Sequence, residues 1–447
     1  MNKNDVYERV EAHFPQTLQN LTELVSIPSV SADSFDQSTL KKSAQWIAEK
    51  AQDLGLEAQV IQVHTKDGKV GRPAVLARRP AEPGKPTVLL YSHHDVQPIG
   101  QESTWKTPPF EATLIGDRLF GRGAADDKGG VVMHLAAIEA ADPGVGITLF
   151  IEGEEEVGSP TFTHFLEEYK EQLAADVIIV ADSNNWAVGT PSLTTSLRGV
   201  VTADVRLSVL DHAVHSGAYS GPVMDAVSLA STLIASLHDE HGDVAVPGLL
   251  SYDDAQVDYP EDQFRRDAGM LEGVQLAGTG SITSRLWTKP TICVIGMDVT
   301  PVAVSSNTLI PSVEFVLSLR VAPGQDSAEA GQVLKDFLQK NAPFGAHVDV
   351  TIRECGPGFV AAEESAVSAM AHEMLTQAYG HEAVNIGIGG SIPFIADLSR
   401  LFPKADILVT GVEDPDTRAH SENESLHVGD WKKGIAAEAL ILSKLGQ

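Results

Sequence analysis

The sequence has few of the features that would place it in a membrane or in a disulfide-stabilised fold. Only two of its 447 residues are cysteines, Cys293 and Cys355, and no CxxC spacing occurs. This usage predicts a reducing compartment, the cytoplasm, with both thiols as small core residues. No apolar run approaches the roughly 18 residues of a membrane span, and the first residues lack the apolar segment of a signal peptide. We therefore expect a cytoplasmic protein with no membrane partner.

Basic residues are also scarce. Lysine and arginine number 32 against 61 aspartates and glutamates, which gives a formal net charge of −29. Nucleic-acid phosphates need a positive partner, so this balance argues against nucleic acid as a ligand. The excess of acid is more simply explained by solubility than by function.

The order of apolar patterns predicts an α/β protein with an inserted domain. A chain of 447 residues is long for one core. Short β-like runs alternate with helical stretches in 1–196 and again in 357–447, which predicts one α/β domain with a mostly parallel sheet and helices on both faces. Residues 197–356 instead follow the order strand, helix, strand, strand, helix, strand, which indicates a smaller ferredoxin-like α+β domain.

Metal-binding side chains follow several of the buried strands. Continuous apolar runs are typical of parallel strands covered on both faces, and ligands gather beyond the carboxyl ends of such strands. The sequence therefore predicts that imidazoles and carboxylates from distant segments meet at one edge of the sheet. The residues concerned follow TVLLYS, GITLFI, DVIIVA and ADILVTG, and they are His93, Asp95, Glu152, Glu154, Glu155, Glu156, Asp182 and His420.

The HHD segment predicts a metal ligand and its orienting partner. His93 and Asp95 are two residues apart, so on an extended strand their side chains share one face. A metal-bound imidazole usually gives its second N–H to a carboxylate, which is the role expected for Asp95. His94 points to the other face and is assigned to structure. A polar strand end with a solvated histidine is the alternative.

Two further acidic segments have both a structural and a chemical interpretation. In GRGAADDKGG, Asp126 lies at the start of a helix, and on these residues alone a helix cap is the favoured interpretation. In EGEEEVGS, neighbouring carboxylates at the tip of a buried strand repel one another unless a cation is present. Glu155 and Glu156 can divide the roles of base and ligand, with Glu152 and Glu154 as bystanders. Taken singly, Asp182 can be a helix cap and His420 a surface residue. His215 in HSG fits a structural role and a catalytic role equally well.

Together these segments resemble the carnosinase-like, cytosolic nonspecific dipeptidases. These are two-metal peptidases in a superfamily with carboxypeptidase G, succinyl-diaminopimelate desuccinylase and the aminoacylases. The resemblance covers nearly the whole chain in order. Its motifs are HxD at His93–Asp95, GRGxxDxKG at Gly121–Gly129, EGxEExGS at Glu152–Ser159, Asp182, RG at Arg198–Gly199, HSG at His215–Gly217, SLRxxPGQ at Ser318–Gln325, GGSIP at Gly389–Pro393 and AHSxNE at Ala419–Glu424.

The resemblance implies a role for each matching residue. His93 and Asp182 would bind one metal ion, Glu156 and His420 a second, and Asp126 both. Asp95 would orient His93, and Glu155 would act as general base on the water shared by the metals. His215 would stabilise the oxyanion from the partner subunit of a homodimer. Arg320, Asn307 and Ser391 would contact the substrate, Arg320 through its terminal carboxylate.

We therefore expect a two-metal hydrolase of dipeptides or other short peptides with a free C-terminal carboxylate. Zinc is the first choice of metal, with manganese or cobalt as alternatives, because the ligands are imidazoles and carboxylates. An N-acyl amino acid deacylase or a carboxypeptidase with the same metals is the alternative function, although Asp at position 182 favours the dipeptidase branch. Ile388 stands where carnosinase-type relatives often carry an acid. A two-metal phosphoesterase and a non-catalytic binding protein are the more distant alternatives.

Overall fold

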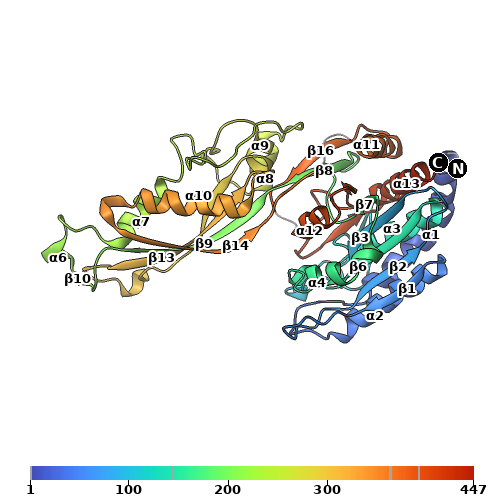
Figure 1. Ribbon diagram of the computed structural model, residues 1–447, viewed down its shortest axis with the longest axis horizontal. Helices are drawn as coiled ribbons and strands as arrows, with labels where there is room; N and C mark the ends of the chain where they lie inside the picture. Colours follow the sequence, from blue (N-terminus) through green and yellow to red (C-terminus); the bar gives the residue numbers. More distant parts are fainter. Residues whose placement is uncertain (1–2, 142–143, 362–364, 391–392) are drawn as a thin grey trace. The chain divides into compact units, whose positions relative to one another are not determined.

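The computed structural model describes residues 3–141, 144–361, 365–390 and 393–447. The chain forms two compact units (Figure 1). The first unit consists of residues 1–194, 361–385 and 397–447, and the second unit consists of residues 195–360 and 386–396. The second unit is therefore inserted in the sequence of the first.

The first unit is built on a six-stranded sheet in the order β1-β2-β6-β3-β7-β17. The pairs β6–β3, β3–β7 and β7–β17 are parallel, whereas β1–β2 and β2–β6 are antiparallel. This confirms the expected mostly parallel sheet and adds an antiparallel edge. The strands are β1 (Glu57–Ile61), β2 (Ala74–Arg79), β3 (Thr87–His93), β6 (Gly146–Glu152), β7 (Val177–Val180) and β17 (Asp406–Val409).

Helices cover both faces of this sheet, as the continuous apolar strands predict. In β6, Leu149 and Ile151 belong to the large core that includes α1, α2, α3 and α13. Phe150, between them, stacks on Phe165 of α4 with 4.6 Å between ring centroids. The helices of this part are α1 (Lys3–Val25), α2 (Ser38–Asp53), α3 (Lys128–Ala141), α4 (Phe162–Glu168), α5 (Lys170–Leu173), α11 (Ala366–Tyr379) and α13 (Val428–Leu445), and α12 (Pro393–Leu401) includes residues of both units.

The second unit has the expected ferredoxin-like order of elements. Its four-stranded antiparallel sheet runs β11-β13-β9-β14, with α7 and α10 packed on one face (Figure 1). Alternate residues of β9 enter this core, as in a half-exposed strand. The elements are β9 (Gly199–Ser208), β10 (Val214–His215), α6 (Ser216–Tyr219), α7 (Ala226–Ala235), α8 (Glu261–Asp267), α9 (Ile282–Trp287), β11 (Thr291–Met297), β12 (Thr308–Leu309), β13 (Ser312–Val321), α10 (Ser327–Lys340) and β14 (His347–Gly356).

Two small sheets complete the list of strands. One runs β15-β8-β16 and the other β18-β5-β4. Their strands are β4 (Thr113–Ile115), β5 (Arg118–Phe120), β8 (Ser192–Leu197), β15 (Phe359–Val360), β16 (Val384–Ile388) and β18 (Ser425–His427).

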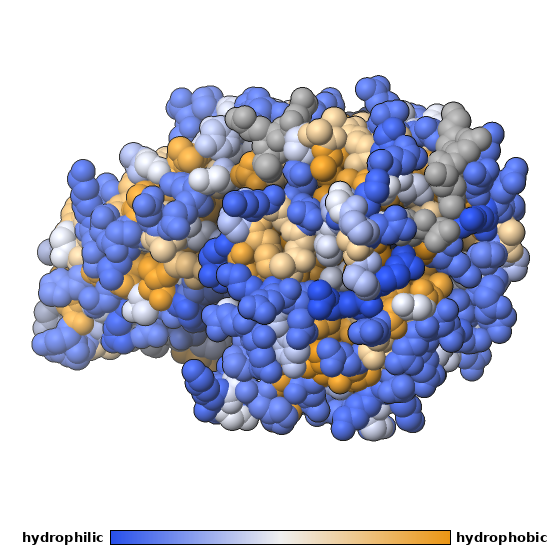
Figure 2. Space-filling view, turned by 45° about the vertical axis from the view of Figure 1, so that its right-hand side comes forward, coloured by the Kyte–Doolittle hydropathy of each residue, from blue (hydrophilic) through white to orange (hydrophobic). Residues whose placement is uncertain are grey.

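The surface drawn in Figure 2 is largely hydrophilic, and both cysteines of the chain are exposed. Hydrophilic side chains predominate on the face drawn in Figure 2, with hydrophobic ones in separate areas between them. Cys293 and Cys355 are free and exposed, so their assignment to the core was wrong. Cys293 follows the core residue Ile292 on β11 and so turns away from the helix-covered face of the second unit's sheet, whereas Cys355 is paired with the core residue Val201 near the end of β14. Among the described helices, none combines the length and apolarity needed to cross a membrane.

Candidate metal centre

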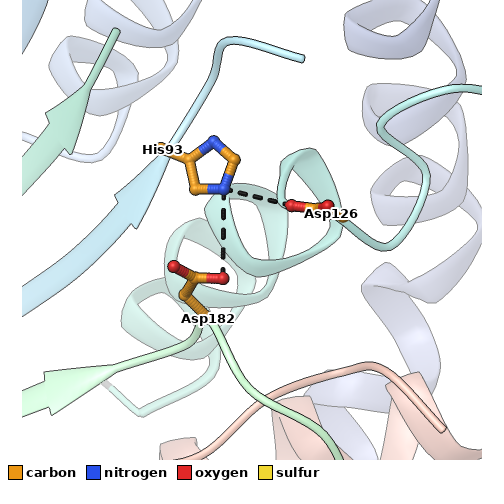
Figure 3. Close-up of side chains that lie close together, drawn as sticks. All are labelled: His93, Asp126 and Asp182. Atoms are coloured by element: carbon orange, nitrogen blue, oxygen red, sulfur yellow. Dashed lines mark ion pairs between the residues drawn. The ribbon is translucent and has the colours of Figure 1, made fainter. Parts of the chain in front are cut away.

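His93 is the last residue of β3 and lies where neighbouring parallel strands end. Its Nε2 atom is 3.1 Å from Oδ1 of Asp126 and 3.9 Å from Oδ1 of Asp182. Figure 3 shows both carboxylates turned towards this one ring nitrogen. Asp182 follows β7, and Asp126 comes from the loop that precedes α3. Three segments that are distant in sequence thus form one group that can hold a metal ion.

A second group shares Asp126 with the first. The other carboxylate oxygen of Asp126, Oδ2, lies 3.1 Å from Nε2 of His420. The same nitrogen is 3.1 Å from Oε2 of Glu156. Asp126, Glu156 and His420 therefore form a second potential ligand set. Asp126 offers one oxygen to each set, which is the arrangement of a carboxylate that bridges two ions.

The residues present fit divalent metal ions. Nε2 of His93 is buried and makes no hydrogen bond, although it points into a group of carboxylates. An orphaned buried nitrogen costs free energy, and carboxylates packed together repel one another. A divalent cation removes both costs, because it accepts the imidazole lone pair and neutralises the carboxylates. Imidazole and carboxylate donors without thiolates suit zinc, manganese or cobalt.

The side chains that could bind metal ions bind protons more tightly than usual in this cluster. Burial, opposed by His93 and reinforced by Asp126, raises the pKa of Asp182 to about 6. Hydrogen bonds to Asp126 and Glu156 raise the pKa of His420 to about 11. Metal ligands must lose such protons on binding, so the site is expected to release protons as it takes up ions.

Glu155 lies in a short turn directly after β6, beside both ligand groups. Burial raises the pKa of its carboxyl well above the usual range, and the charges of Asp182 and Glu156 add to this effect against the opposing influence of His93. Glu155 belongs to neither ligand set, whereas Glu156 belongs to one. Of these adjacent residues, Glu156 is therefore a ligand candidate and Glu155 is not.

Asp95 has a wider role than its sequence spacing predicts. Nδ1 of His93 lies 3.1 Å from the main-chain oxygen of Asp95 and 3.5 Å from Oδ1 of its carboxylate. The carboxylate also accepts hydrogen bonds from the backbone N–H groups of Glu155, at 3.2 Å, and Glu156, at 3.0 Å. This buried side chain therefore contacts His93 and the turn that carries Glu155.

Glu424 is a residue of the site region to which the sequence gives no role. Its buried carboxylate accepts hydrogen bonds from the backbone N–H groups of Gly123, Ala125 and Asp126. It also pairs with Arg122, whose Nη1 lies 2.6 Å away. Glu424 thus ties the loop of Asp126 to the loop of His420. Arg122 lies in the GRG motif and Glu424 in the AHSxNE motif, but no local sequence pattern indicates that these two residues pair.

The loop that carries His420 has an unusual backbone. Arg418 and His420 have φ of 60° and Asn423 has φ of 63°, a region that residues other than glycine seldom occupy. The amide of Asn423 fixes the loop, accepting from the backbone N–H of Lys106 at 2.6 Å and donating to the carbonyl of Thr104 at 3.2 Å. Such strain persists only where the surroundings enforce it, and it is common at functional sites.

The three side chains expected to be bystanders are buried in the scaffold. Nε2 of His94 lies 2.8 Å from a backbone carbonyl oxygen, and burial lowers the pKa of His94 to about 4. Glu152 accepts a hydrogen bond from Tyr91, and Glu154 accepts from the backbone N–H of Thr161. These contacts turn them away from both ligand sets.

The remaining predicted residues belong to the second unit, apart from Ser391, which lies outside the described residues. His215 in β10 pairs with Thr308 of β12, and the N–H of Ser216 donates to the carbonyl of Asn307 at 2.9 Å. His215 and Asn307 are therefore neighbours. Arg320 lies near the other end of β13, eight residues beyond Ser312.

The fold and the two ligand sets define a metal-dependent hydrolase. Residues 89–444 match the peptidase family M20/M25/M40, and the chain belongs to this family of metallopeptidases. It is 34% identical over 438 residues to a cysteinylglycine-S-conjugate dipeptidase from Corynebacterium striatum, covering 96% of this chain and 95% of the relative. It is 26% identical over 477 residues to human β-Ala-His dipeptidase, covering 99% and 92%.

Solved structures share the fold. Human carnosine dipeptidase 1 superposes with a TM-score of 0.76 at 24% identity, over 100% of this chain and 99% of that one. The M20 metallo-carboxypeptidase Sso-CP2 from Sulfolobus solfataricus also gives a TM-score of 0.76, at 26% identity, over 96% and 99%. The family membership confirms the resemblance that the ordered motifs indicated.

Proposed function

We propose that this protein is a dipeptidase that uses two divalent metal ions. The observation that carries the proposal is the position of Asp126, whose two oxygens face two separate ligand sets. His93 and Asp182 would complete one site, and Glu156 and His420 the other. Zinc is the first candidate, with manganese and cobalt as alternatives. The named dipeptidase relatives, each similar over nearly the whole chain, support a dipeptide as substrate.

The roles of the protein's own groups follow from their positions. When bound, the ions supply Lewis acidity, which polarises the scissile carbonyl and acidifies water. Glu155, beside both ligand sets but in neither, takes the proton of the attacking water and delivers it to the leaving amine. Asp95 holds the turn of Glu155 and the ring of His93. Arg320 would pair with the terminal carboxylate of the substrate, and Asn307 and Ser391 would contact the rest of it.

The substrate class can be tested by turnover. Metal-reconstituted protein is expected to release free amino acids from unblocked dipeptides faster than from N-acyl amino acids, because the relatives are dipeptidases and Asp182 has the residue type of that branch. A parallel panel of both substrate types, read by amino-acid release, measures this. Faster turnover of the N-acyl compounds would instead support a deacylase or carboxypeptidase, which the similarity to Sso-CP2 keeps as the second candidate. Absence of turnover on both would remove the proposal.

We also propose a cytoplasmic homodimer in which His215 acts on the site of the partner subunit. Residues 1–196 and 357–447 would form the catalytic domain, and 197–356 the lid and dimerisation domain. His215 and Asn307 lie together, where β10 pairs with β12. Strand β13 begins at Ser312, three residues after β12 ends, and Arg320 lies eight residues further along it. At about 3.3 Å per strand residue, Arg320 is about 26 Å from Ser312. One substrate of dipeptide size cannot reach across that length. A dimer resolves this separation, because each subunit can supply the two ends to different sites.

Mixing two inactive variants tests this arrangement. His215→Ala is expected to lower kcat by about 10²–10³-fold, the usual effect of removing one oxyanion donor. Mixed in equal amounts with Glu155→Gln and allowed to exchange subunits, it should recover about a quarter of wild-type activity, since half of the dimers are hybrids with one intact site. Activity that stays at the level of the separate variants would place His215 at its own subunit's site.

A further inference from the structure

Gln97 makes a specific contact with one ligand candidate. It follows His93 by four residues, in the segment between β3 and the short 3-10 helix Glu102–Thr104. Its side-chain Nε2 donates a hydrogen bond to Oε2 of Glu156 at 2.8 Å and another to the main-chain oxygen of Glu156 at 3.0 Å. Both partners are acceptors, so only the NH₂ end of the amide satisfies them. Gln97 thus holds both the backbone and the carboxylate of one residue.

The oxygen that Gln97 holds is the one that faces the second ligand set. Oε2 of Glu156 lies 3.1 Å from Nε2 of His420. A free glutamate side chain has three rotatable bonds, and each must be fixed before its oxygen can act as a ligand. The bond from Gln97 fixes them in advance and leaves the other lone pair of Oε2 for a cation. A neutral amide does this without adding a competing charge.

We propose that Gln97 is a positioning residue that selectively strengthens the metal site formed by Asp126, Glu156 and His420. The inference rests on the proposed two-metal function and adds an asymmetry between its sites. The imidazole at the first site is contacted by the charged carboxylate of Asp95, whereas the carboxylate at the second is held by a neutral amide. Loss of such a partner of a metal ligand typically lowers metal affinity by about 10–100-fold.

The test is zinc binding alone, measured on apoprotein by competition with a chelating indicator and by metal content after dialysis. Gln97→Met keeps length and volume but removes both hydrogen bonds. Wild-type protein should bind two zinc ions per subunit. The variant should bind one ion as wild type does and the other about 10–100-fold more weakly. Gln101→Met, the same change at a nearby exposed glutamine, should leave both affinities unchanged.

Background variants identify which ion is affected. In an Asp182→Asn background, which weakens the first site, adding Gln97→Met should lower the affinity for the zinc ion that remains. In a His420→Ala background, which weakens the second, adding it should change nothing. Equal weakening in both backgrounds, or in neither, would overturn the role of Gln97 while leaving two-metal binding intact. Wild-type protein that bound fewer than two zinc ions would instead overturn the proposed function itself.

Discussion

Replacing Glu155 by glutamine is expected to lower kcat by about 10²–10⁴-fold, the usual contribution of a general acid–base group. Glutamine keeps the size of the side chain but cannot take a proton from water at neutral pH. Glu155 lies in neither ligand set, so the variant should bind metal with the stoichiometry of wild type. Steady-state kinetics on a dipeptide together with metal analysis of the same samples measures both quantities.

The matched control is Glu167→Gln, which removes the same charge from an exposed position of α4. Its kcat and metal content should equal those of wild type. Glu155→Asp, which withdraws the carboxylate by one methylene, should retain more activity than Glu155→Gln because the group remains a base. Full activity in Glu155→Gln would show that another group takes the proton, and a loss of metal would show that Glu155 is a ligand.

The features that depend on strand ends could be predicted from the sequence. Parallel strands have their carboxyl ends at one edge, so residues that follow buried apolar runs must meet there. This reasoning anticipated that His93 and Asp182 lie together, as the structure shows, whereas Asp126 was expected there only from the family resemblance. The order of elements in the second unit was also predictable, because half-exposed strands alternate in polarity where doubly buried ones do not.

Contacts between distant segments could not be predicted from local sequence patterns. The carboxylate of Asp95 reaches the backbone of Glu155, and that of Glu424 reaches the loop of Asp126. The first pair is separated by 60 residues and the second by 298. Such contacts depend on how loops fold beyond the sheet, and no periodicity records that. The left-handed backbone of His420 is equally hidden, since glycine, the usual signal for positive φ, is absent from that position.

The exposed cysteines show a different limit. Cysteine is among the residue types most often buried, so composition alone predicts core positions for Cys293 and Cys355. Both instead occupy exposed positions on strands β11 and β14. Which face of a strand is covered depends on where α7 and α10 pack, and α7 and α10 pack on one face only. A preference that holds on average therefore fails at Cys293, which lies on the uncovered face of β11, while Cys355 is exposed near the end of β14.

Asp126→Asn is expected to have the largest effect among the substitutions at the ligand sets, because among the residues that the structure describes Asp126 alone belongs to both sets. Asparagine keeps the shape but loses the charge, and it can offer only its carbonyl oxygen to a cation. Losing Lewis-acid stabilisation of several kcal/mol should lower kcat/KM by about 10³-fold or more. Either Asp182→Asn or His420→Ala should weaken the binding of one ion only, so metal content per subunit separates Asp126→Asn from these two variants.

Thermal unfolding gives a readout of Asp126 that does not depend on turnover. An ion that binds only the folded state stabilises it by about 2.7 kcal/mol at a free concentration one hundred times its Kd. Adding zinc to wild-type apoprotein should therefore raise Tm, and adding it to Asp126→Asn should raise Tm much less. Asp53→Asn, the same substitution at an exposed position of α2, should respond as wild type does. An undiminished zinc-dependent rise in Tm for Asp126→Asn would show that the two sites do not need a shared carboxylate.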